Sequence, residues 1–155
     1  MWKKWYVRVL LVLAAVFALI QLVPYGRDHT NPSTRVEPQW SSPEVRALAV
    51  RACFDCHSNQ TVWPWYSHVA PVSWLAQRDT MEGREKLNFS EWNRPQDEAD
   101  EAAEELRSGE MPMWFYKLPH PEARFSDAER EQLARGFTQM FGEEHDVASA
   151  GRESE

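Results

Sequence analysis

The chain keeps both of its cysteines, Cys53 and Cys56, in one short stretch, and His57 follows them directly. Residues three apart on a helix lie on the same face, so both thiols would point toward the same neighbouring surface. Three chemistries use such a group: a redox dithiol, part of a metal site, or a covalent attachment point for haem. Each needs a different fold around the motif, so the rest of the chain decides among them.

The residues before the motif predict a helix. Ser41 and Glu44 have the spacing of a capping box. Ser42 offers an alternative N-cap, with Pro43 at the first helical position. Apolar residues then recur at helical spacing as one stripe that includes both thiols: Val45, Leu48, Ala49, Ala52, Cys53 and Cys56.

The remainder of the chain predicts an all-α fold. Helical patterns cover residues 71–86 and 96–109, and Gly109 supplies a stop signal. A second capping box, Ser126 with Glu129, opens a last helix whose apolar face we expect to cross the helix that leads to Cys56. Proline-broken loops separate these helices, and no stretch alternates as a strand would.

The first 23 residues form a segment that differs in composition from the rest of the chain. A basic start precedes an unbroken apolar run, and aromatic residues lie near its beginning. Residues 5–23 come close to the length that crosses a bilayer, and no small-residue cleavage site follows them. We therefore expect an uncleaved helix in the cytoplasmic (inner) membrane, with everything after Val23 on the extracytoplasmic, periplasmic side.

The net charge of −7 argues against nucleic acid as a partner, because binding phosphates needs clustered basic residues. Residues 1–23 hold no acidic residue, so the rest of the chain is more acidic than the whole. An acidic face favours a partner protein with a basic surface, although such charge also keeps a domain soluble. The helix predicted over residues 96–109 has such a face: Asp97, Asp100, Glu101, Glu104 and Glu105.

The surroundings of the cysteines favour haem. A thioredoxin-like dithiol lies at the start of a helix that follows a strand, whereas this pair ends a helix in a chain without strands. Zinc needs a fourth ligand, and His68, His120 and His145 are scattered. The spacing C-x-x-C-H is the signature of c-type haem attachment. We expect one haem c, bound covalently by Cys53 and Cys56, with His57 as the proximal iron ligand.

At these residues the chain also resembles the bacterial haem-binding domain proteins, which are small membrane-anchored relatives of cytochrome c. The resemblance runs from about Val23 to Phe141 and rests on the stretches "VPYGRDHTNP", "RACFDCHSNQTVWPWYSHVAPVSW", "EGREKLNFSEW" and "GEMPMWFY…HPEARFSDAER". It implies a cytochrome c-like helical fold. Met113 stands where the family pattern is closer to a second proline, which leaves open which methionine approaches the iron.

The resemblance implies that Met111 is the distal iron ligand, since it matches the family position in a loop beyond the haem motif. Pro112 fixes the backbone beside it, and a thioether ligand raises the potential of the iron. Met113, His68 or an open position are the alternatives. Trp63 and Trp65 are candidates for a wall of the haem pocket.

These observations predict four parts: a membrane anchor over 1–23, a linker over 24–40, a c-type haem-binding domain over 41–142, and a disordered tail over 143–155. The function expected is single-electron transfer by a membrane-anchored monohaem cytochrome, with no catalytic residues and no enzymatic activity of its own. The alternative is a haem-based sensor or accessory subunit whose distal ligand is open or displaceable.

Overall fold

A computed structural model describes the backbone of residues 2–150 and the side chains of residues 4–142. Across this part of the chain the structure is helical, without named strands, which confirms the all-α class. One isolated β-bridge pairs Val36 with Glu91. The elements are α1 (Trp2–Ile20), α2 (Pro43–Ala52), α3 (Phe54–His57), η1 (Trp65–His68), α4 (Val72–Lys86), α5 (Ala102–Ser108), η2 (Pro121–Ala123) and α6 (Asp127–Ala150).

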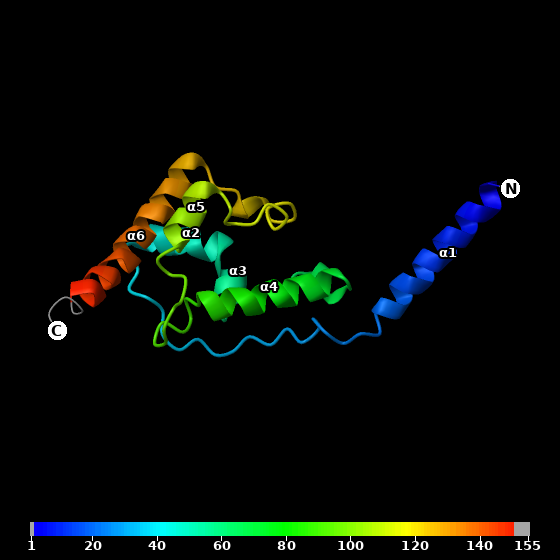
Figure 1. Cartoon of the computed structure of the whole chain (residues 1–155), viewed down its shortest axis with the longest axis horizontal. Coiled ribbons are helices and arrows are strands. Elements are labelled where there is room, and N and C mark those ends of the chain that lie inside the picture. The colour runs from blue at the N-terminus through cyan, green and yellow to red at the C-terminus, as the bar shows by residue number, and fades with distance from the viewer. Residues whose placement is uncertain (1, 151–155) are drawn as a thin grey trace.

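Helices α2, α5 and α6 gather at one end of the molecule, with α4 below them and α1 standing apart at the other end (Figure 1). The crossing of α2 and α6 is the one expected from the sequence. Gly136 allows it, because a Cβ atom at this position would lie 2.7 Å from both methyl groups of Val45. The capping box of α6 also forms, since Glu129 N–H donates to Ser126 Oγ over 3.2 Å.

The helix expected to run from residue 43 through both thiols is broken. Ser42 caps α2 by accepting from Val45 N–H, and α2 ends at Ala52. Cys53 has φ −117° and ψ −32°, and a new short helix, α3, starts after it. Within α3 the N–H of His57 donates to the carbonyl of Cys53 over 2.8 Å. The break therefore leaves Cys53 at the junction of α2 and α3 and Cys56 within α3, in place of the single helical stripe predicted.

Aromatic side chains fill the centre of the core. Phe89 is fully buried, and its ring lies 5.2 Å from that of Trp40, 5.6 Å from Phe54 and 5.7 Å from Phe137. Trp92 stacks on Phe89 and on Phe141, whose ring lies 5.1 Å away. These aromatic side chains therefore hold α3 and α6 against the segments that contain Trp40 and Phe89.

The segment expected to be a free linker, residues 24–40, is extended but docked. We call it the strap. The N–H groups of Arg35 and Val36 both donate to the carbonyl of Ser90, over 2.9 and 3.2 Å. Glu37 accepts two hydrogen bonds from Arg46 on α2. The strap therefore belongs to the folded domain, because its backbone and side-chain hydrogen bonds are made to that domain.

Helix α1 forms where a helix was expected, but the membrane crossing predicted for residues 5–23 is not found. No helix in the described part of the chain is both long and apolar enough to span a bilayer. Helix α1 ends at Ile20 and carries Lys3, Lys4 and Arg8. Gln21, just after it, exchanges two hydrogen bonds with the backbone of Ala70, 3.0 Å and 2.9 Å long.

Two other predicted boundaries shift. Helix α5 covers only the second half of the predicted span 96–109, and it ends as expected at Gly109, whose φ of 82° is left-handed. Helix α6 continues to Ala150, so residues 143–150, assigned above to a disordered tail, have helical backbone. The remainder of that predicted tail, residues 151–155, lies outside the described residues.

Candidate functional site

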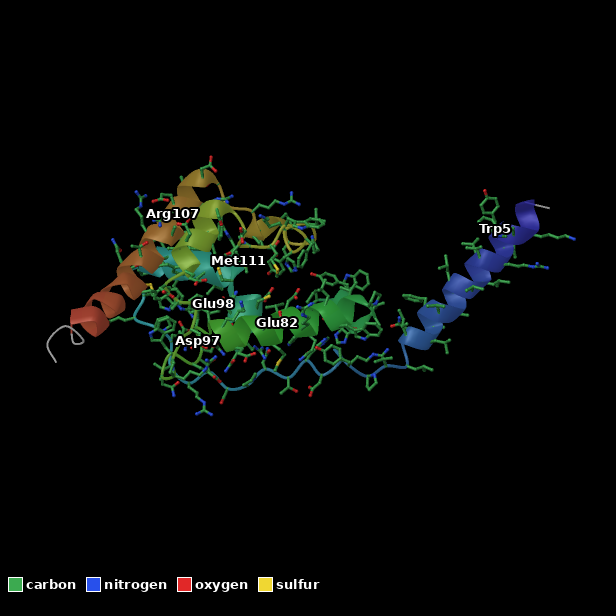
Figure 2. The ribbon with its side chains drawn as sticks, in the orientation of Figure 1. Trp5, Glu82, Asp97, Glu98, Arg107 and Met111 are labelled. Atoms are coloured by element: carbon green, nitrogen blue, oxygen red, sulfur yellow. The ribbon has the colours of Figure 1, made fainter. Side chains whose placement is uncertain are left out.

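A cavity of about 390 Å³ lies between α3 and α4 on one side and α5 with its following loop on the other. Cys53, Cys56 and His57 line it, and so do Met111 and Met113. The fold therefore brings together the residues predicted to bind haem or its iron, apart from the two tryptophans and the alternative ligand His68. Figure 2 shows Met111 and two acidic residues of the same cavity, Glu82 and Glu98.

The ring of His57 is fixed from behind by α4. Its Nδ1 lies 3.0 Å from the carbonyl oxygen of Gly83 and 3.1 Å from that of Leu87. A carbonyl only accepts, so Nδ1 carries the hydrogen and Nε2 keeps its lone pair. Burial lowers the pKa of His57 from its usual value, more strongly than these hydrogen bonds raise it. The histidine is thereby held as a neutral ring with Nε2 ready to bind a metal.

Gly83 makes this arrangement possible. A Cβ atom at this position would lie 2.7 Å from the carbonyl oxygen of Cys56, closer than such atoms come in proteins. Helices α3 and α4 can therefore approach until the α4 carbonyls reach the imidazole. An isolated glycine inside a helical pattern often has such a packing reason, so the sequence did contain this signal.

Both thiols are free in the structure and are poor nucleophiles there. Burial raises the pKa of Cys53 to about 12, and the neighbouring Cys56 adds to the effect. Burial also raises the pKa of Cys56 to about 12, with further contributions from Asp55 and Asp79. A redox dithiol needs a thiolate stabilised near neutral pH, so these environments argue against that alternative.

The methionines face the cysteines from a loop. Gly109 ends α5, the N–H of Met111 donates to the carbonyl of Glu105 over 3.1 Å, and Pro112 is buried. Met111 and Met113 are both half-buried and both line the cavity. Met113 also lines a second, smaller cavity next to the first.

Three other candidates lie elsewhere. His68 is exposed and its ring packs edge-on against His29, with 4.2 Å between the centroids. Trp63 stacks on His29 at 4.3 Å and lines only the second cavity. Trp65 is 78% exposed and lines neither cavity. The structure therefore does not bring Trp63 and Trp65 into the wall of the large cavity, because the loop they occupy turns toward the strap.

The donor set fits a c-type haem. Two thiols and an oriented imidazole lie on one side of a roomy cavity with two thioether sulfurs across it, which are the groups that hold and ligate such a haem. A comparison with protein-family models finds the haem-binding domain over residues 15–139. The chain belongs to the haem-binding domain family. Neither the comparison with curated proteins nor that with solved structures found a match.

The rim of the cavity in this haem-binding domain is acidic. Lys86 is its only lysine or arginine, and it pairs with Glu98 over 2.6 Å. Desolvation raises the pKa of Glu105, and the carboxylates of Glu110 and Glu101 raise it further. The carboxylates that line the cavity are Asp79, Glu82, Glu98, Glu101, Glu105 and Glu110.

Sequence reasoning missed a polar network behind the haem-binding wall. Arg84 is buried and donates to the carbonyl of Ser58, to Asn31 Oδ1 and to Thr61 Oγ1, at 2.8–2.9 Å. Asn31 also accepts from the indole of Trp63 over 3.2 Å. Asn31 comes from the strap, where nothing in composition or periodicity marked it, so only the tertiary structure reveals the network.

Proposed function

We propose that this haem-binding domain is a monohaem c-type cytochrome that carries single electrons. The observation that supports it best is the His57 ring, which α4 holds as the tautomer that leaves Nε2 free, beside two cysteines in one cavity. Cys53 and Cys56 would hold the haem through thioether bonds. Met111 would serve as the distal ligand. When bound, the haem supplies an iron that alternates between two oxidation states.

The protein contributes position and environment. Two backbone carbonyls keep His57 from rotating, and the close contact at Gly83 keeps α3 against α4. Phe89, Leu106 and Phe137 give the cavity an apolar floor that excludes water. A rigid, dry pocket keeps reorganisation small, and a thioether ligand favours the reduced iron.

The test is to coexpress the chain with a c-type haem maturation system and to record spectra of both oxidation states. Covalent haem should survive denaturation in the wild type and be lost in the Cys53→Ser/Cys56→Ser double variant. Wild-type iron should be low-spin with a near-infrared thioether band, which Met111→Ala removes. High-spin iron that binds carbon monoxide readily would instead favour the sensor function.

We also propose that the domain works outside the cytoplasm with a partner whose docking surface is basic. Covalent haem attachment of this type takes place outside the cytoplasm, so haem should attach only to exported protein. The acidic rim supports the choice of partner, because opposite charges steer the encounter. Glu101→Lys should slow electron exchange with a basic cytochrome, most strongly at low salt. Asp28→Lys, in the strap and outside the rim, is the control.

A further inference from the structure

A second cavity, of about 140 Å³, lies beside the one assigned to haem. The two share Cys56, Asp79 and Met113, so a wall of a few side chains separates them. It is a half-open pocket lined by the first half of α4, the segment 61–66 and the loop around residues 113–120. The electron-carrier function proposed above makes no use of this space.

The walls of this second cavity suit a flat apolar molecule. They carry the aromatic faces of Trp63 and Phe115 and the aliphatic side chains of Val72, Leu75 and Ala76. A cavity of about 150 Å³ with apolar walls is known to hold one benzene ring. The volume therefore matches that of a single six-membered ring.

One part of the lining is polar, and its side chains form a chain of hydrogen bonds from Tyr66 through His120 to Glu122. His120 Nδ1 lies 2.7 Å from a carboxylate oxygen of Glu122, so Nδ1 donates to it, and in the neutral ring the other nitrogen, Nε2, then accepts. Tyr66 Oη lies 2.5 Å from that Nε2 and therefore donates to it. The hydroxyl oxygen of Tyr66 then has no hydrogen left to give but keeps a lone pair.

A second tyrosine also uses its hydroxyl hydrogen in a hydrogen bond within the protein. Tyr116 donates its hydroxyl hydrogen to Asp55 Oδ2 over 2.7 Å. Its ring stacks on that of His120, with 4.2 Å between centroids and 14° between planes, which fixes the two tyrosines relative to each other. Both hydroxyl oxygens can therefore only accept, so a complementary ligand must bring a hydrogen-bond donor.

We propose that the second cavity binds a one-ring phenol. The ring occupies the space between Trp63, Phe115 and the apolar residues of α4, and the phenol hydroxyl donates to the oxygen of Tyr66. This site does not depend on the redox function of the haem. It places a small aromatic alcohol against the haem-attachment residue Cys56, which lines both cavities.

The experiment titrates the full chain, with its haem attached, against phenol and against toluene, which has a similar shape but no hydroxyl, using calorimetry. Phenol should bind more tightly than toluene. Tyr66→Phe, which keeps the ring and removes only the oxygen, should weaken phenol binding about tenfold and leave toluene unchanged. Equal affinities for both ligands in the wild type, or an unchanged phenol affinity in Tyr66→Phe, would overturn the proposal.

A second pair of variants tests the location. Ala76→Leu fills the cavity and should abolish binding of both ligands, whereas Ala47→Leu, on the exposed face of α2, should bind like the wild type. Circular dichroism and haem content establish that each variant is folded and loaded. Phenol binding that persists in Ala76→Leu would refute the site. Absence of covalent haem in the wild type would refute the cytochrome function instead, since the second cavity can be titrated without it.

Discussion

The two walls of the haem cavity are built differently. The wall with His57 is held by backbone contacts: two α4 carbonyls bond to the ring, and Gly83 lets α3 and α4 touch. The opposite wall is a loop whose methionines are half-buried, and its backbone is tied to α5 by the hydrogen bonds of Met111 N–H to Glu105 and of Glu110 N–H to Ser108. The first wall holds the imidazole of His57 in one orientation, while the second offers two methionine sulfurs, those of Met111 and Met113.

The difference shows that the side chains of the His57 wall are held in one geometry and those of the methionine wall are not. If the haem is attached as proposed, the wall with His57 has to present two thiols and one nitrogen in a single geometry, and close helix packing provides that. The methionine side has to supply only one soft sulfur, which a flexible thioether can deliver from more than one position. Substitutions on the first wall should therefore damage the whole domain, and those on the second should change only how the iron is ligated.

The largest effect is expected from Gly83→Ala. The new methyl group would meet the Cys56 carbonyl at 2.7 Å, so α3 and α4 must separate and His57 loses its carbonyl partners. The domain should lose about 1–3 kcal/mol of stability, which urea denaturation measures. Gly142→Ala is the control, because its Cβ atom would find only a methyl group at 3.9 Å. Equal stability of both variants would mean that the tight contact does not matter.

Asn31→Ala tests whether the support of the first wall extends to the strap. This change leaves the buried Arg84 and Trp63 without one acceptor each, and a donor without its acceptor costs about 1–3 kcal/mol. Thermal unfolding would measure the loss. Asn93→Ala, at an exposed position, should leave the melting temperature unchanged. A melting temperature like that of the wild type for Asn31→Ala would show that the strap only lies on the surface.

Met113→Ala probes the second wall. The side chain is half-buried, so the expected loss is about 1–2 kcal/mol, and the two cavities should merge because Met113 lines both. The near-infrared thioether band should persist if Met111 is the ligand. Disappearance of the band in Met113→Ala, with its retention in Met111→Ala, would reverse the assignment of the distal ligand.

The smallest effect is expected where α6 meets α2. The hydrogen bond from Arg51, with those from Ser126, lowers the pKa of Glu129 from 4.5 to about 2. A lowered pKa in the folded state adds stability above pH 4.5, and this stability is lost as the pH falls toward 2. Glu129→Gln should therefore melt earlier than the wild type at neutral pH and equally at pH 2. A melting difference that does not depend on pH would exclude this ionic contribution.

The haem motif and most of the helices could be predicted from sequence because their signals are local. Caps at Ser42 and Ser126, a stop at Gly109 and the spacing of Cys53, Cys56 and His57 act within one or two turns. The break at Cys53 could not be predicted, since the apolar stripe continues through it. The tilt of α3 is set instead by its contact with α4, which lies far along the chain.

The aromatic residues show a different limit. Trp63 and Trp65 were predicted to wall the haem pocket, yet Trp63 lines only the second cavity and Trp65 is exposed, while Trp40 and Trp92 pack around Phe89 in the core. Composition records how much aromatic surface a chain has but not which interior it fills. Likewise the strap resembled a linker because several of its hydrogen bonds go to residues far along the chain, such as Thr61 and Ser90.

The docked strap also gives the domain a mechanical property. It joins α1 to the region behind the haem wall, where Asn59 donates to the carbonyl of Ser33 and Arg84 bridges Asn31 to the carbonyl of Ser58. Ser58 directly follows His57. A force on α1 would thus have to stretch these hydrogen bonds of Asn59 and Arg84 together before it reached the imidazole of His57. The strap would thereby shield the imidazole that we propose as an iron ligand from tension along α1.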